Sequence, residues 1–341
     1  AYDTEKAVAI AAVARACQLT HRVFHQLVAD QVITKDDQSP VTVADYGAQA
    51  VVLHALAAAF PADPVVAEEA IEEGSASAAQ LEAVRALVNG VLPTPLALAD
   101  IKAAINRGAH DPSVDPQGRF WTLDPIDGTK GFLRGDQYAV CLCLIDRGVP
   151  QVAVMGGPNL PLSLASTAEA PIHQQAAAPR GALLIAVRGE GVEQRWLDVA
   201  TGTVREGGVP VQMRATTAPS DAAFVEGVEH GHSDQATQNM VATRLGIRGH
   251  VQMDSQCKYA VLARGDADVY LRLPVKPGYR EKIWDHAPGV LLVQEAGGIV
   301  TDMHGAPLDF TRGRTLVDQQ GVIAASAHFH PLVMEVLRDA K

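Results

Sequence analysis

The stretch Trp121-Thr122-Leu123-Asp124-Pro125-Ile126-Asp127-Gly128-Thr129-Lys130-Gly131-Phe132 constrains the folding of this chain more than any other. The aromatic and branched residues before Asp124 favour a strand, and Pro125 biases Asp124 away from helical geometry. Asp124 is therefore predicted to stand where a strand ends. Gly128 and Gly131 allow a ligand to approach the backbone closely, and a helix beginning there would offer free N–H groups to an anion.

Asp124 and Asp127 bring two carboxylates into this turn, and two facing carboxylates need a cation between them. Oxygen ligands with no Cys or His nearby indicate Mg²⁺ rather than zinc. The alternative is an ordinary Asp-Gly turn with a capping Asp. The stretch alone does not decide between a metal site and a turn, so the other segments matter.

Composition narrows the class of protein. A chain of 341 residues with 48% hydrophobic content suits a globular protein of about two domains. No apolar run approaches the roughly 18 residues of a membrane span and the first residues lack the order of a signal peptide, so we expect a cytoplasmic protein with no membrane partner. The four cysteines form no C-x-x-C pair and are interpreted as reduced core residues.

The formal charge of −11 argues against a nucleic-acid duplex as partner, because binding to phosphate backbones depends on basic side chains. An anionic small molecule would need bound cations to enter such a protein. We expect a monomer that acts on a small molecule.

Two acidic segments precede the central stretch. Thr42 followed by Asp45 resembles a capping box, which would explain Asp45 structurally. Asp36 and Asp37 lie in a loop with no helix to cap, so one of them is a candidate base; a solvated acidic loop is the alternative.

Glu68 and Glu69 end the short apolar run 64–67, much as Asp124 ends its own strand. Acids delivered by separate strand ends can share a cation, because ligands from one local segment rarely complete a coordination shell. The alternative for this pair is the acidic first turn of a helix.

The pattern of elements predicts an α+β half followed by an α/β half. Helical spacing covers residues 4–30 and much of 74–108, and strands at 138–145 and 149–155 form a hairpin in an antiparallel sheet. Beyond about residue 216, strands alternate with helices. We therefore predict an N-terminal domain at 1–215 and a C-terminal domain at 216–341.

In the second half, polar residues fall at the ends of predicted elements: His232, Ser255, Lys258 and Arg272. Such ends line the ligand crevice of an α/β sheet. Singly, each has a structural explanation as a loop residue, a helix cap, a solvated helix residue or a surface strand residue. Lys258 and Arg272 have no carboxylate partner in their own segments, as contact with a phosphate would require.

A further acid begins the predicted helix that runs to Glu295. Asp285, within Trp284-Asp285-His286-Ala287-Pro288-Gly289, is explained as an N-cap, and Pro288 is tolerated in a first turn. A capping carboxylate can still bind metal through its other oxygen.

Together these segments make the chain resemble the lithium-sensitive, Mg²⁺-dependent phosphatase superfamily of inositol monophosphatase. The resemblance rests on Glu68-Glu69, on Asp124-Pro-Ile-Asp127-Gly128-Thr129 and on Trp284-Asp285-His286-Ala-x-Gly289. Within the superfamily, the segments 37–42, 225–233, 254–259 and 269–274 resemble the 3′(2′),5′-bisphosphate nucleotidases of fungi. The resemblance covers nearly the whole chain and implies the layered αβαβα sandwich of the inositol monophosphatase and fructose-1,6-bisphosphatase type.

The resemblance also implies roles for single residues. Two or three Mg²⁺ ions would be held per site, one by Glu68, Asp124 and the Ile126 carbonyl and another by Asp124, Asp127 and Asp285. Asp37 and Thr129 would orient and deprotonate the attacking water, and Lys258 and Arg272 would meet phosphate. Contacts to the substrate would also come from Gly128, Thr129, His232, Ser255 and Asp285. Ala70 and Pro288 depart from the usual pattern but remove no ligand.

The implied reaction is hydrolysis of the 3′-phosphate of adenosine 3′,5′-bisphosphate, and possible further substrates are its 2′,5′ isomer and phosphoadenosine phosphosulfate. One alternative is an inositol polyphosphate 1-phosphatase, which would share the metal chemistry but need a polyol pocket. A remoter alternative is a non-catalytic sensor of phosphonucleotides; the sequence argues against it because no metal ligand is missing.

Overall fold

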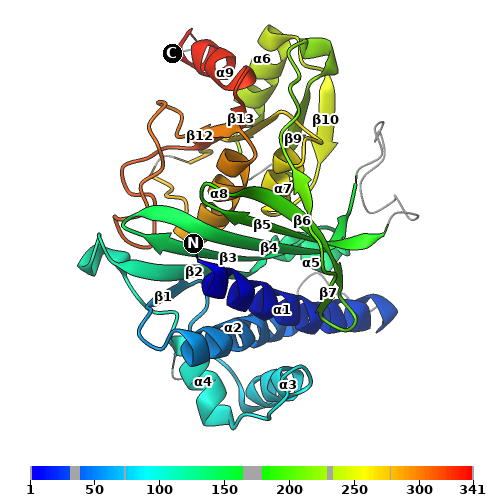
Figure 1. Ribbon diagram of the computed structural model, residues 1–341, viewed down its shortest axis with the longest axis vertical. Coiled ribbons are helices and arrows are strands. Elements are labelled where there is room, and N and C mark those ends of the chain that lie inside the picture. Colours follow the sequence, from blue (N-terminus) through cyan, green and yellow to red (C-terminus); the bar gives the residue numbers. More distant parts are fainter. Residues whose placement is uncertain are drawn as a thin grey trace.

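The computed structural model describes residues 2–30, 39–72, 74–163, 179–228, 233–276 and 278–339. Two long helices, α1 (Asp3–Asp30) and α2 (Ser39–Ala59), pack against each other and cover one face of the first sheet (Figure 1). Helices α3 (Ala78–Asn89) and α4 (Leu98–Asn106) pack on the far side of α2. The predicted N-terminal and covering helices are thus present.

The first sheet follows the order β1-β2-β3-β4-β5-β6-β7, and β8 pairs with β6. Only β1 and β2 run parallel; the other pairs are antiparallel, and β3 and β4 form the predicted hairpin. The strands are β1 (Val65–Ala67), β2 (Arg119–Asp127), β3 (Ala139–Asp146), β4 (Val149–Pro161), β5 (Arg180–Val187), β6 (Gly191–Asp198), β7 (Thr203–Val204) and β8 (Val209–Val211). Strands β6 to β8 were not predicted, since their side chains alternate little between apolar and polar.

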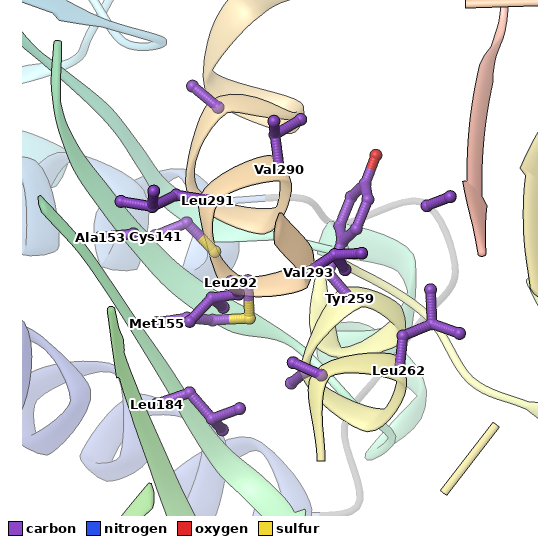
Figure 2. Packing of buried hydrophobic residues seen from close by; sticks show 14 of the residues in the cluster. Cys141, Ala153, Met155, Leu184, Tyr259, Leu262, Val290, Leu291, Leu292 and Val293 are labelled. Atoms are coloured by element: carbon purple, nitrogen blue, oxygen red, sulfur yellow. The ribbon is translucent and has the colours of Figure 1, made fainter. Parts of the chain in front are cut away.

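This sheet is buried on both faces, because successive strand residues point to opposite sides. On β3, Val140 and Leu142 pack toward α1 and α2, whereas Cys141 and Cys143 join the core on the other side. Figure 2 shows Cys141 and neighbouring sheet residues facing the helix α8 (Ala287–Glu295). The four cysteines are free and buried, in agreement with their interpretation as core residues.

The second sheet lies beyond α8 and α7 (Cys257–Ala263), and α6 (Gln235–Leu245) and α9 (Phe329–Asp339) cover its outer face (Figure 1). Its order is β10-β9-β11-β13-β12, in which β10, β9 and β11 are parallel and β13 is antiparallel to both neighbours. The strands are β9 (Ala223–Glu226), β10 (Gly249–Gln252), β11 (Val269–Arg272), β12 (Gly298–Thr301) and β13 (Val322–Ser326). The layers are therefore helix, sheet, helix, sheet and helix, and the expected αβαβα fold is confirmed. The boundary at 215/216 stays a prediction.

Three local predictions are wrong. Helix α2 begins at Ser39, so Thr42 and Asp45 lie inside it and form no capping box. Asp285 ends a short 3₁₀ turn, η5 (Ile283–Asp285), and the residue that precedes α8 is His286. The segment Val41–Ala59 is apolar and long enough to cross a membrane, contrary to the expectation from the sequence, although 72% of it is buried inside the protein.

Gly289 permits the close contact between α7 and α8. A Cβ atom at this position would lie 2.2 Å from the Tyr259 ring, which is itself fully buried. We predict that Gly289→Ala lowers the free energy of unfolding by about 1–3 kcal/mol, the usual cost of overpacking a core. Denaturant unfolding measures this change. Gly47→Ala is the matched control, because its Cβ would meet only the flexible Leu19 side chain at 3.1 Å; equal effects in both variants would contradict the argument.

Candidate active site

The parallel pairing of β1 and β2 brings two acids together. Ala67 is opposite Leu123 in the register, and the Glu68 N–H donates to the Leu123 carbonyl at 3.3 Å. The next residue on β2 is Asp124, which is buried. Glu68 follows the end of β1, as predicted, and is not in the first turn of a helix. The prediction that Asp124 ends its strand is wrong, because β2 continues to Asp127 after a register shift between the two acids.

The turn that follows β1 is held by its backbone. The Gln49 side chain on α2 donates to the Glu69 carbonyl at 2.7 Å and accepts from the Glu69 N–H at 3.0 Å. Arg314, from the other half of the chain, donates to the Ala67 carbonyl. These bonds fix Glu68 against the repulsion of its acidic neighbours.

A second turn places Asp127 and the start of α5 (Thr129–Arg134). Gly128 between them has a φ of 86°, in the left-handed region, and a Cβ there would meet the Ser255 Cβ at 2.8 Å. Ser255 also has a positive φ, 66°, and directs the following N–H, that of Gln256, to the Asp127 carboxylate. The glycine is therefore needed both for the turn and for the approach of the second half of the chain.

Asp285 completes the acidic group from the end of η5. Ligand atoms of Asp124, Asp127 and Asp285 all lie within 4.8 Å of one another. These three carboxylates come from two positions of β2 and from a 3₁₀ turn more than 150 residues further along the sequence. One cation can therefore contact all three.

The predicted site residues that the structure describes line one pocket of about 360 Å³. They are Glu68, Asp124, Ile126, Asp127, Gly128, Thr129, Ser255, Lys258, Arg272 and Asp285. Asp37 and His232 lie outside the described residues.

The carboxylates raise one another's pKa. Burial, followed by the charges of Glu68, Asp127 and Asp285, raises the pKa of Asp124 well above its usual range. Burial and Asp127 raise the pKa of Asp285 to about 7. Desolvation and the charge of Glu69 raise the pKa of Glu68 to about 7. Such a group is unfavourable without a counter-charge.

A hard divalent cation fits this group. The Oδ1 atom of Asp124 is buried and has no hydrogen-bond partner, although buried polar atoms normally have one. The donors are carboxylate oxygens, which Mg²⁺ prefers. A bound cation would give this oxygen a partner and would offset the repulsion.

Two cations also line the pocket, Lys258 and Arg272. Lys258 on α7 is buried, and its Nζ lies 5.5 Å from the centre of the Tyr270 ring. Burial lowers the pKa of Lys258, against the charges of Asp127 and Asp254, which raise it. Lys258 forms no salt bridge within 4 Å in the described part of the chain. Arg272 differs from the prediction, because it does have a carboxylate partner: its Nε donates to Glu281 at 3.1 Å.

Asp45 is the main residue that the sequence interpretation missed. It is buried on α2, its Oδ1 atom has no hydrogen-bond partner, and burial with Glu69 and Glu68 raises its pKa well above the usual range. It also contributes to the raised pKa of Asp124. The sequence signal for a functional role was an acid within an otherwise apolar stretch of helix, but the capping box offered a structural explanation for Asp45 instead.

Comparison with known proteins extends these observations to the whole chain. Residues 2–341 match the model of the inositol monophosphatase family. The chain belongs to this family. A relative from Schizosaccharomyces pombe named 3′(2′),5′-bisphosphate nucleotidase is 47% identical over 98% of this chain and 95% of its own length. One of the same name from Emericella nidulans is 45% identical over 95% and 94%.

Solved structures of this family share the fold. The extragenic suppressor protein suhB of Bartonella henselae superposes with a TM-score of 0.62 at 20% identity, covering 99% of this chain and all of that one. An inositol monophosphatase from Anabaena gives 0.61 at 20% identity, covering 98% and 96%. At these identities the likeness concerns the fold alone.

The raised pKa values generate a prediction about stability. Between about pH 4 and 7 the folded protein holds protons on Asp285 and its neighbours that the unfolded chain releases, so stability falls as pH rises through this window. In EDTA, we expect the Tm to fall from pH 5 to pH 8, and we expect added Mg²⁺ to recover it at pH 8. Thermal unfolding of wild type and Asp285→Asn measures this, and the variant should show a flatter dependence.

Asp100→Asn, an exposed acid of α4, serves as the control and should keep the wild-type slope. A slope in Asp285→Asn equal to that of wild type would show that the acidic group does not carry the effect.

Proposed function

We propose that this protein is a Mg²⁺-dependent phosphatase that removes the 3′-phosphate of adenosine 3′,5′-bisphosphate, giving AMP and inorganic phosphate. The observation that carries the proposal is the convergence in one pocket of a carboxylate group and a buried lysine that forms no salt bridge within the described residues. The names of relatives that match nearly the whole chain support the nucleotide substrate. The 2′,5′ isomer and phosphoadenosine phosphosulfate are further candidate substrates. A cytoplasmic location and a monomeric state stay predictions.

The acidic residues would bind two metal ions. Glu68, Asp124 and the Ile126 carbonyl would hold one ion, and Asp124, Asp127 and Asp285 would hold a second. Bound Mg²⁺ supplies Lewis-acid stabilisation of phosphoryl oxygens and a lowered pKa for water. The role of the chain is to hold five oxygen donors at one place against their repulsion, which the backbone bonds of both turns do.

A base is needed to take the proton of the attacking water, and two acids are candidates. Asp37 is favoured by resemblance, together with Thr129, which begins α5 at the pocket wall. Asp45 is favoured by its buried, unpartnered oxygen beside the acidic group and by a pKa raised toward the range in which a carboxylate accepts protons well.

The phosphate that is not removed would meet Lys258. This ammonium group is buried in the pocket lining and forms no salt bridge within the described residues, so a phosphate would provide a direct counter-charge. Arg272 would contribute beside it, with part of its charge already balanced by Glu281. Gly128, Ser255 and His232 would complete the contacts to the substrate.

An inositol polyphosphate 1-phosphatase is the nearer alternative, since the acidic group would serve it equally. A substrate panel decides between them: adenosine 3′,5′-bisphosphate, its 2′,5′ isomer, phosphoadenosine phosphosulfate and an inositol bisphosphate, each with Mg²⁺ and with EDTA. We expect phosphate release to be fastest from the adenosine bisphosphates and to stop in EDTA. Faster release from the inositol bisphosphate would overturn the proposal. A non-catalytic sensor would release phosphate from none.

Lys258 should discriminate between a bisphosphate and a monophosphate. A charge-assisted contact is worth about 1.5–3 kcal/mol, or roughly 10- to 150-fold. We predict that Lys258→Ala lowers kcat/KM for adenosine 3′,5′-bisphosphate by about that factor and changes kcat/KM for adenosine 3′-monophosphate much less. Lys102→Ala, on α4 and outside the pocket lining, is the matched control. Equal losses on both substrates would assign Lys258 to the fold or to the phosphate that leaves.

Replacing each candidate base separately tests the assignment. The base acts on the transition state, so its loss should lower kcat by about 10²-fold or more with little change in KM. We predict this result for Asp45→Asn, since Asp45 is the candidate with the structural observation. Steady-state kinetics of Asp45→Asn and Asp37→Asn measure it. If the kcat loss falls on Asp37→Asn while Asp45→Asn keeps its activity, the resemblance assigns the base correctly and the geometric argument does not.

A further inference from the structure

Glu281 holds two site elements at once, although it does not line the pocket itself. Its side chain is buried, with a residue exposure of 5%. One carboxylate oxygen accepts from Arg272 Nε at 3.1 Å, and the other lies 3.2 Å from His286 Nε2. Both oxygens of this buried acid are therefore engaged by side chains that do line the pocket.

The hydrogen bonds continue through His286 to α7. The Nδ1 atom of His286 lies 2.7 Å from the Tyr259 hydroxyl. A carboxylate can only accept, so the Nε2 atom of His286 donates to Glu281, while Nδ1 is hydrogen-bonded to the Tyr259 hydroxyl. This chain of bonds fixes the orientation of the His286 ring directly after Asp285.

The network connects three of the elements that bring the second half of the chain to the pocket. Arg272 ends β11, His286 follows the 3₁₀ turn that presents Asp285, and Tyr259 follows Lys258 on α7. Figure 2 shows Tyr259 beside Val290 and Val293 of α8. Within the network, Glu281 is the residue that contacts both Arg272, at the end of β11, and His286, directly before α8.

A metal ligand is the other reading of Glu281, because its carboxylate, Asp285 and His286 bring potential ligand atoms within 4.8 Å of one another. Two observations oppose it. The guanidinium of Arg272 already neutralises the Glu281 carboxylate, and its positive charge would repel a metal ion bound to the same carboxylate. Glu281 is also absent from the pocket lining, whereas the other acidic group opens into it.

We propose that Glu281 is a positioning residue that sets the Arg272 guanidinium for the substrate and the Asp285–His286 turn for the metal. The inference rests on the proposed function for the identity of the substrate. A neutral or shorter side chain at position 281 should disturb both arms together: substrate binding through Arg272, and the Mg²⁺ requirement through Asp285.

The test compares Glu281→Gln with wild type. The amide keeps the size of the side chain but removes the negative charge beside Arg272. Its NH₂ group would also face either Arg272 Nε or His286 Nε2, both of which are donors. We expect KM for adenosine 3′,5′-bisphosphate and the Mg²⁺ concentration for half-maximal activity each to rise about 10-fold or more. Tyr259→Phe removes only the far end of the network, and should raise the Mg²⁺ requirement with less effect on KM.

Asp266→Asn is the matched control, a carboxylate bonded to Arg264 outside the pocket lining. It should keep the wild-type KM and Mg²⁺ requirement even if its Tm falls. If Glu281→Gln behaves in the same way, with a lower Tm alone, Glu281 serves the fold and the inference is wrong. Should Glu281→Gln fail to fold, Glu281→Asp keeps the charge but cannot reach both partners, and wild-type values in it would equally overturn the inference.

Measuring the binding of Mg²⁺ and of AMP by calorimetry distinguishes a failure of this inference from a failure of the proposed function, because binding can be measured without turnover. A wild-type protein that binds both but releases no phosphate from the adenosine bisphosphates contradicts the proposed function. Weaker binding of both ligands by Glu281→Gln, about 10-fold or more, would still support the positioning role, and unchanged binding would refute it.

Discussion

The mutual repulsion of carboxylates around Asp124 is the constraint on which the rest of the structure depends. Four acidic side chains approach one another at one end of the first sheet. Burial raises the pKa of all four, and the neighbouring carboxylates raise it further for Glu68, Asp124 and Asp285. A group of this kind disperses unless its backbone is held elsewhere. Here the backbone is held by the parallel register of β1 and β2, by Gln49 on one turn and by the Gln256 N–H that faces Asp127. The stability of the fold thus maintains a local arrangement that is unfavourable without a cation.

The five layers explain why both halves of the chain are needed for one site. The largest core cluster joins the inner face of the first sheet to α7, α8 and the second sheet. Asp124 and Asp127 belong to the last part of β2 on one side of this core, and Asp285 ends the 3₁₀ turn η5 that leads into α8 on the other. Packing between the layers therefore fixes the distance between ligands that are far apart in the sequence. A predicted boundary near residue 215 separates the two sheets but would not separate two functions.

The sequence predicted the elements whose evidence is local and missed the contacts that depend on the fold. Strands β3 and β4 follow from alternation and a turn. Glu68 and Asp124 are neighbours as expected, but through the parallel register of β1 and β2, because β2 continues past Asp124 to Asp127. Asp45 was misjudged because Thr42 and Asp45 fit a capping box, whereas the helix begins three residues earlier at Ser39. Arg272 was judged free of acidic partners because Glu281 is nine residues away and reaches it only after a loop returns. Such pairs have no signature in residue spacing.

The helices α7 and α8 between the two sheets position charged residues of the pocket relative to one another. The acidic wall comes mainly from the first sheet, whereas Lys258 and Arg272 come from α7 and β11 and lie near enough to Asp127 to lower its pKa. A ligand with two anionic groups separated by a neutral part matches this division once a cation reverses the charge of the acidic wall. The spacing of the walls is set where α7 meets α8, at the contact between Tyr259 and Gly289. Because that contact lies next to the Tyr259–His286–Glu281 bonds, packing between two helices is coupled to the position of charges on both walls.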